Sequence, residues 1–158
     1  MEKEAEVIAF VLQQPHRRDA PVPHDPHLVT LIGRLIEGGE LLSSLPKNIL
    51  HDASKRFAAD YGRYQRALLS RRPLAVTGGR VLRAEDAEAD EREYRSACEA
   101  FAAAGRALRA AGDRVEKAAD AAILHAAPEA LSSTLAPWIK LSLPAGLAAL
   151  VEHYRLGG

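Results

Sequence analysis

The chain has 158 residues and no net formal charge at pH 7, and it is 47% hydrophobic but only 5% aromatic. A chain of this length can bury a core as one domain, and its shortage of aromatic and β-branched runs favours packed helices over a β-sandwich. A single cysteine excludes a disulfide within the chain. The acidic start lacks a secretory pattern, and no apolar run approaches the roughly 20 residues of a membrane span. We therefore expect a soluble, cytoplasmic protein with no membrane partner.

The first 45 residues predict two helices separated by a proline-rich loop. Residues 2–14 have the spacing of a short amphipathic helix, whereas four prolines within residues 15–26 exclude a helix there. Asp25 and Pro26 form an N-cap followed by proline at the first helical position, and a helix should follow them. The pair Gly38-Gly39 either breaks this helix or allows a very close packing partner.

Residues 47–71 predict an amphipathic helix, because apolar side chains recur there at steps of three and four. These are Ile49, Leu50, Ala53, Phe57, Tyr61, Tyr64 and Leu68. Residues 72–83 then form either a loop or a small β-hairpin that turns at Gly78-Gly79.

A seven-residue repeat is the clearest pattern in the second half of the chain. Large and small side chains alternate along Tyr94, Ala97, Phe101, Ala104, Leu108, Ala111 and Val115. Such a stripe indicates a helix packed closely against another helix. Gly112-Asp113 could end it, with Asp113 and Glu116 as a capping box, but the repeat continues across them. We therefore predict one continuous helix over residues 85–126.

Prolines at positions 128, 137 and 144 divide the C-terminal part into three short predicted helices that fold back over the long one. The overall prediction is an all-α single domain, residues 1–158. It is a helical bundle around one long central helix, with a small β-hairpin near Gly78-Gly79 as an option.

The stripe predicts a small helical interaction or adaptor protein that binds a protein partner or itself. The expected packing or interface residues are Tyr94, Ala97, Phe101, Ala104, Leu108, Ala111 and Val115. Whether they face a partner or the chain's own core is left open by the sequence.

The alternative is nucleic-acid binding through the basic segment 47–83. That segment has nine basic and two acidic residues, a net charge of +7. Cations neutralise phosphates, and neighbouring tyrosines can stack on bases. The candidate residues are Lys55, Arg56, Arg63, Arg66, Arg71, Arg72 and Arg80. A helix followed by a basic hairpin resembles the outline of a winged helix-turn-helix. In the opposing interpretation, these cations form an ordinary solvent-exposed helix face, or they pair with the acidic start of the long helix.

His51-Asp52 resembles the histidine–acid start of a histidine-kinase dimerisation helix, and Lys55 resembles the lysine near the histidine of phosphotransfer domains. This likeness implies an exposed, phosphate-accepting imidazole. The Leu-Lys-Gly that follows the phosphotransfer histidine is absent, since Ala53-Ser54-Lys55 follow here.

A small all-α metal-dependent enzyme is the third hypothesis. His24 and His27 have a spacing used by metal sites, although such sites need three or four converging ligands. Carboxylates also recur at one-turn spacing in Glu37 and Glu40, Glu88 and Glu91, and Asp113 and Glu116. Ferritin-like sites need a Glu-x-x-His, which this sequence lacks. We expect no catalytic residue, no metal and no cofactor.

Overall fold

The computed structural model describes residues 25–70 and 84–157, with side chains of the second range described from residue 87 onward. All regular structure in these ranges is helical, so the all-α prediction is confirmed for them. The α-helices in chain order are α2 (Leu31–Glu37), α3 (Lys47–Ser70), α4 (Ala84–Ala111), α5 (Asp113–Ala119) and α6 (Pro137–His153). Short 3-10 turns occupy Pro26–Leu28 and Ser132–Thr134, and a π-helical turn occupies Asp120–Leu124. The predicted helix 2–14, most of the proline-rich loop and the predicted hairpin lie outside the described residues.

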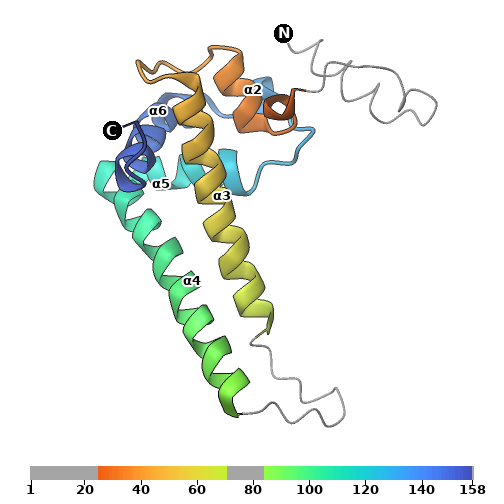
Figure 1. The fold of residues 1–158 in the computed structure, drawn as a ribbon. Coiled ribbons are helices and arrows are strands. Elements are labelled where there is room, and N and C mark those ends of the chain that lie inside the picture. Colours follow the sequence, from red (N-terminus) through yellow and green to blue (C-terminus); the bar gives the residue numbers. More distant parts are fainter. Residues whose placement is uncertain (1–24, 71–83, 158) are drawn as a thin grey trace, which may run out of the picture.

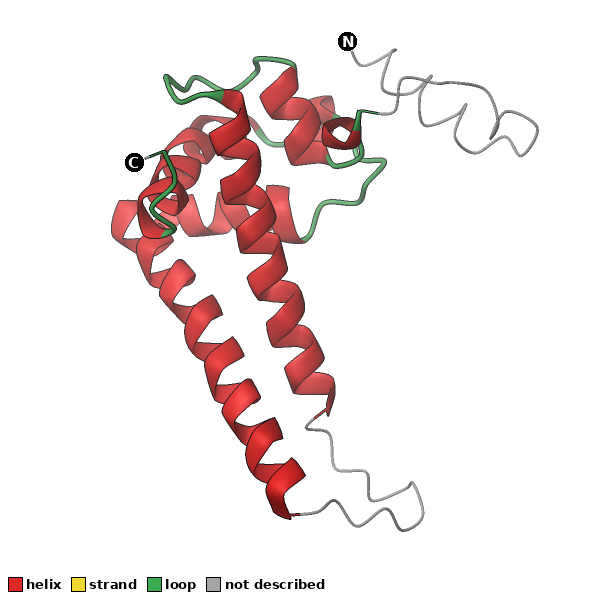
Figure 2. Cartoon of the chain, in the orientation of Figure 1, coloured by secondary structure: helices red, strands yellow, loops and turns green. Residues whose placement is uncertain are grey.

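The molecule has a head and a two-helix arm (Figure 1). Helices α3 and α4 are antiparallel neighbours of 24 and 28 residues, or about 36 and 42 Å at 1.5 Å per residue. Helices α2, α5 and α6 gather around one end of this pair and form the head. We call residues 60–70 of α3 and 84–97 of α4 the arm. At its base the arm contacts the head through Asp60, which accepts a hydrogen bond from Tyr154, and through Tyr61, whose ring lies against His125. Beyond this base the arm lies beside no other described element in Figure 2.

The core lies in the head, where the short helices cover the base of the arm. One cluster centres on Leu35, Leu50 and Leu143, and a second on Phe57 and Leu108, all of them at most 4% exposed. Helix α6 belongs to both clusters, which explains why it is apolar on nearly all sides. None of the described helices is long and apolar enough to cross a membrane.

The sequence predicts the head's first elements well. Asp25 caps the turn Pro26–Leu28 and accepts a hydrogen bond from the His27 amide at 2.9 Å. Helix α2 ends at Glu37, and Gly39 takes the left-handed conformation with φ of +68°. The predicted interruption at Gly38-Gly39 is therefore a helix end. Helix α3 begins at the predicted residue and extends to Ser70, the last described residue before the gap.

The predicted continuity of the helix 85–126 is wrong. The chain breaks at Gly112, whose φ of +150° is a conformation that only glycine adopts easily. Helix α5 then starts a new direction, and Ala111 is left exposed at the bend. The capping box that the sequence offered as the alternative to a continuous helix does not form either, since α5 has no side-chain cap. Glu116 instead places its Oε2 2.9 Å from Nε of Arg109, across the break.

The predicted helix boundary at Pro144 is also wrong, because α6 runs through this proline. A proline inside a helix removes one backbone hydrogen bond and costs about 3 kcal/mol. Its neighbours Leu143 and Leu147 are both fully buried. Each buried leucine contributes roughly 1.5–3 kcal/mol, so core packing offsets the local cost.

Candidate functional site

The heptad stripe packs mainly inside the chain. Ala97, Ala104 and Leu108 on α4 are completely buried, and Val115 on α5 is 7% exposed. Phe101 packs its ring against α3, with centroids 5.9 Å from Phe57, 5.3 Å from Tyr61 and 5.2 Å from Tyr64. Tyr94 is half-buried on the arm, and Ala111 is exposed. Any partner surface must therefore lie mostly outside this stripe.

The described basic candidates all lie on α3. Lys55, Arg56 and Arg66 are exposed there, whereas Arg63 is half-buried. Arg71, Arg72 and Arg80 lie outside the described residues. Tyr61 and Tyr64 are half-buried and pack on Phe101, which leaves less of each ring exposed for stacking on bases.

Arg63 ties the two helices of the arm together. Its guanidinium donates to Glu93 Oε1 at 2.7 Å and to Ser96 Oγ at 2.8 Å. The hydrogen bond between Arg63 and Glu93 raises the pKa of the arginine and lowers the pKa of the glutamate. One basic residue thus pairs with the acidic start of α4, as in the opposing interpretation of the basic segment.

The outer surface of the arm has exposed apolar side chains and sorted charge. Leu68 and Leu69, near the end of α3, are 38% and 60% exposed. Helix α3 has five basic and two acidic residues, a net charge of +3. Helix α4 has four basic and seven acidic residues, a net charge of −3. Within the arm itself, α3 has two basic residues and one acidic residue, a net charge of +1, and α4 has two basic and six acidic residues, a net charge of −4. The arm is therefore acidic, and most of the positive charge of α3 lies in the head.

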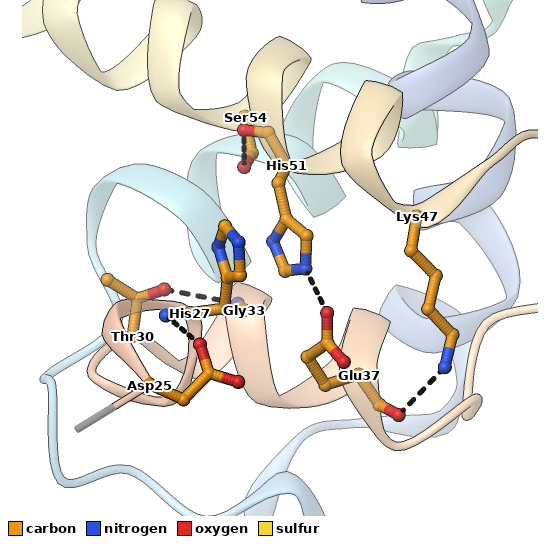
Figure 3. Close-up of polar contacts among 8 residues, drawn as sticks. All are labelled: Asp25, His27, Thr30, Gly33, Glu37, Lys47, His51 and Ser54. Atoms are coloured by element: carbon orange, nitrogen blue, oxygen red, sulfur yellow. Dashed lines mark hydrogen bonds and ion pairs between the residues drawn. The ribbon is translucent and has the colours of Figure 1, made fainter. Parts of the chain in front are cut away.

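A second candidate, at the base of α3 in the head, is a buried polar cluster (Figure 3). His51 is only 3% exposed, and its Nε2 lies 2.7 Å from Glu37 Oε1. The His27 ring stacks on it, with centroids 3.8 Å apart and an interplanar angle of 16°. Nδ1 of His27 is buried without a hydrogen-bond partner among the described residues.

Local backbone contacts hold this cluster in place. Thr30 caps α2 through a hydrogen bond from the Gly33 amide to its Oγ1 at 3.1 Å. Gly33 lies against the His27 carbonyl, where a Cβ would overlap the oxygen. Lys47 Nζ donates to the backbone oxygen of Glu37 at 3.2 Å, which links the start of α3 to the end of α2.

The cluster's geometry is that of a packed core group. Imidazole lone pairs lie in the ring plane, so two parallel stacked rings cannot direct them at one metal ion. The described part of the chain holds no group of three or more His, Cys, Asp or Glu residues that could bind a metal. Burial of His51 also contradicts the likeness to phosphate-accepting histidines, which need an exposed ring. His24 lies outside the described residues.

The predicted carboxylate pairs have separate partners. Glu37 contacts His51, whereas Glu40 Oε1 accepts from Ser132 Oγ at 3.2 Å and lies 3.6 Å from Lys140 Nζ. Glu88 is exposed, and Asp113 is exposed beyond the helix break. None of these pairs faces a second acidic pair across a buried helix interface among the described residues.

The sequence reasoning missed the contacts among His27, Glu37 and His51. One signal was present: His51 follows Leu50 and precedes Phe57 on the buried face of a confidently predicted helix. That position indicated a buried imidazole in need of a hydrogen-bond partner. Its partners come from α2 and the turn before it, and no sequence spacing identified them.

Comparisons of the chain with protein-family models, with curated proteins and with solved structures found no match. The fold alone therefore defines the class of this protein. Its described residues form an all-helical structure with a compact head and a two-helix arm.

Proposed function

We propose that this is a helical interaction or adaptor protein that binds a protein partner, or a second copy of itself, through the outer faces of its arm. The observation that carries the proposal is the arm's isolation. From the Arg63–Glu93 pair to the tip of the arm, α3 and α4 lie beside each other and beside no other described element (Figure 1).

An isolated helix pair gains little from packing, because most helix stability in proteins comes from tertiary contacts. A partner laid along the arm would supply such contacts. It would also cover Leu68 and Leu69, and each leucine that becomes fully buried contributes roughly 1.5–3 kcal/mol. The acidic charge of the arm's α4 segment would help to orient the partner.

The polar cluster favours binding over catalysis in the described part of the chain. His51 is enclosed and hydrogen-bonded, and its ring is covered by His27. A catalytic imidazole has to reach a substrate, directly or through one water. The cluster instead joins the turn before α2 to α3 and so stabilises the head that holds the arm.

Site-specific photo-crosslinking tests the proposal. A photoreactive residue replaces Leu69 on the arm in one variant and Leu141 on α6 in a matched control. Both side chains are strongly exposed, at 60% and 74%. We expect discrete adducts from position 69 and few from position 141. Excess unlabelled protein should compete away adducts with a different protein, whereas adducts between two copies of this chain should persist, because an unlabelled copy can take the partner's place. Equal labelling at both positions, or none at position 69, would contradict the proposal.

Nucleic-acid binding remains a second candidate because Lys55, Arg56 and Arg66 are exposed along one helix. Three neutralised phosphates would give a slope of log affinity against log salt of about −2.7. Fluorescence anisotropy with short single- and double-stranded nucleic acids measures this slope. Replacing Arg66 by Glu should then weaken binding, and an absence of binding at low salt would remove this candidate.

A further inference from the structure

We propose that the stacked imidazoles of His27 and His51 form an acid-sensitive switch, which releases the turn Pro26–Leu28 from α3 when both rings carry a proton. The two rings lie face to face, with centroids 3.8 Å apart and an interplanar angle of 16° (Figure 3). His27 belongs to the turn and His51 to α3, so the stack is a direct contact between these two elements. Imidazole is the side chain that ordinarily changes charge between about pH 5 and 8, and the charge at this contact therefore depends on pH.

The first proton is compatible with the closed head. Nε2 of His51 lies 2.7 Å from Glu37 Oε1, so a protonated His51 ring forms an ion pair with this carboxylate. His51 is only 3% exposed, and a buried charge needs such a partner. One positive charge in the stack therefore has its compensation in place.

A second proton, on His27, has no comparable compensation. It would place another positive charge against the His51 ring at 3.8 Å, and like charges at this distance repel strongly where water is excluded. A protonated imidazole also donates from both nitrogens. Nδ1 of His27 is buried and has no hydrogen-bond partner among the described residues, so its proton would have no acceptor. Both penalties disappear when the turn moves away and the His27 ring enters water.

The charged groups nearest the stack supply no net negative charge for this second proton. Of the two neighbouring carboxylates, Glu37 already contacts His51, and Asp25 Oδ1 accepts a hydrogen bond from the backbone of the turn. Of the two neighbouring cations, Arg34 on α2 donates to a carbonyl of the turn, and Lys47 on α3 donates to the backbone at the end of α2. These two negative and two positive charges cancel before either ring is protonated.

Charged side chains on the other elements packed here are exposed, remote or already paired. Three on α3 and in the loop that follows the π-helical turn are exposed, namely Asp52, Lys55 and Glu129. Two lie in or next to the π-helical turn, namely Asp120 and His125. That turn lies further along α3, because His125 contacts Tyr61, ten residues or about 15 Å from His51. On α6, Lys140 lies 3.6 Å from Glu40.

The sign of the pH effect follows from proton uptake. The open turn binds one proton more than the closed turn, so closure is stable at higher pH and is lost as pH falls. Because one proton is taken up, the opening equilibrium changes at most about tenfold per pH unit.

An NMR titration of the full chain from about pH 7.5 to about pH 5 tests the switch. Ring-to-ring NOEs between His27 and His51 should be present at the upper pH and lost at the lower one. NOEs of the fully buried Leu147 should persist throughout, because the rest of the head stays folded. The carbon-bound protons of the two rings should report two separate protonation steps, and the ring-to-ring NOEs should disappear in the second.

His27→Phe is the decisive variant, because its ring can still stack on His51 but cannot take up a proton. It should keep the contact between position 27 and His51 at about pH 5. His153→Gln is the matched control, since it removes a histidine whose ring contacts Tyr154 at the far end of α6. It should open in acid as the wild type does. The wild-type titration decides the question by itself if His27→Phe fails to fold.

Four results would overturn the proposal. The first is a stack that persists at about pH 5, and the second is a single protonation step shared by both rings. The third is equal loss of the contact in His27→Phe, or its retention in His153→Gln, because either would place the proton elsewhere. The fourth is simultaneous loss of the Leu147 NOEs, which would mean that acid unfolds the whole head.

Discussion

Replacing Gly33 by alanine tests how tightly the head is built around the polar cluster. A Cβ at this position would overlap the His27 carbonyl oxygen and lie 2.9 Å from Oγ1 of Thr30. The nearest obstacle is backbone, which cannot rotate away as a flexible side chain can. The turn that carries His27 must therefore move, and the stack on His51 must move with it.

The net effect follows from three contributions. Alanine is favoured over glycine inside a helix by about 1 kcal/mol. Loss of the Thr30 cap costs about 1 kcal/mol, and overpacking against a fixed backbone costs about 2 kcal/mol. We therefore expect Gly33→Ala to lower the free energy of unfolding by about 2 kcal/mol.

Gly105→Ala is the matched control, because Gly105 also lies inside a helix. The nearest atom to its added Cβ is Nη2 of Arg109 at 3.8 Å, an ordinary contact. That variant should gain about 0.5–1 kcal/mol. Urea denaturation measures both changes, and NMR of the imidazole protons reports the His27–His51 stack. A Gly33→Ala variant with wild-type stability and unchanged imidazole shifts would refute the reasoning.

Three further substitutions test the core and its titrating groups. Tyr154→Phe removes the 2.6 Å hydrogen bond to Asp60 and should cost about 1–2 kcal/mol in chemical denaturation; an unchanged midpoint would contradict that contact. Ala104→Leu should cost about 1–3 kcal/mol because the site is completely buried, whereas a stable variant of altered mass would place the stripe at an interface. Burial raises the pKa of Asp120, and the negative charge of nearby Glu116 raises it further. The folded chain therefore holds the Asp120 proton more tightly than the unfolded chain does, and the protein loses stability as pH rises above 3.8. Asp120→Asn should be more stable than wild type at neutral pH, by a margin that shrinks in acid; a margin independent of pH would refute the assignment.

The elements that the sequence predicted well are those in which local preference and core packing agree. Helix α3 is one case, because its apolar steps of three and four match the face that the head covers. The start at Asp25-Pro26 is another, since the cap and the fixed φ of proline act within three residues. In both cases neighbouring residues determine the outcome, so periodicity and cap chemistry suffice.

Elsewhere, tertiary structure overrides local pattern. The heptad spacing between Leu108 and Val115 persists although the helix breaks between them, because both side chains reach the core from opposite sides of the bend. Gly146 shows how: a Cβ there would lie 3.2 Å from Val115 and 3.5 Å from Leu108, so α6 packs closely against α4 and α5 at once. A repeat that suits one straight helix also suits two helices around a common neighbour. Sequence spacing alone does not distinguish the two arrangements.

The sorted charge on the arm is where sequence and structure together say more than either alone. Along the sequence, the basic segment before residue 84 suggested nucleic acid. The structure places α3 beside an acidic helix of equal and opposite net charge and commits Arg63 to it. Arg66, one turn further, has no such partner among the described residues, and neither does Asp90. Both side chains are exposed and solvated, and an exposed ion pair between them would contribute only about 0–1 kcal/mol. A basic run along the sequence therefore does not distinguish a nucleic-acid surface from a helix that lies beside an acidic neighbour. The salt dependence of nucleic-acid binding separates these two explanations.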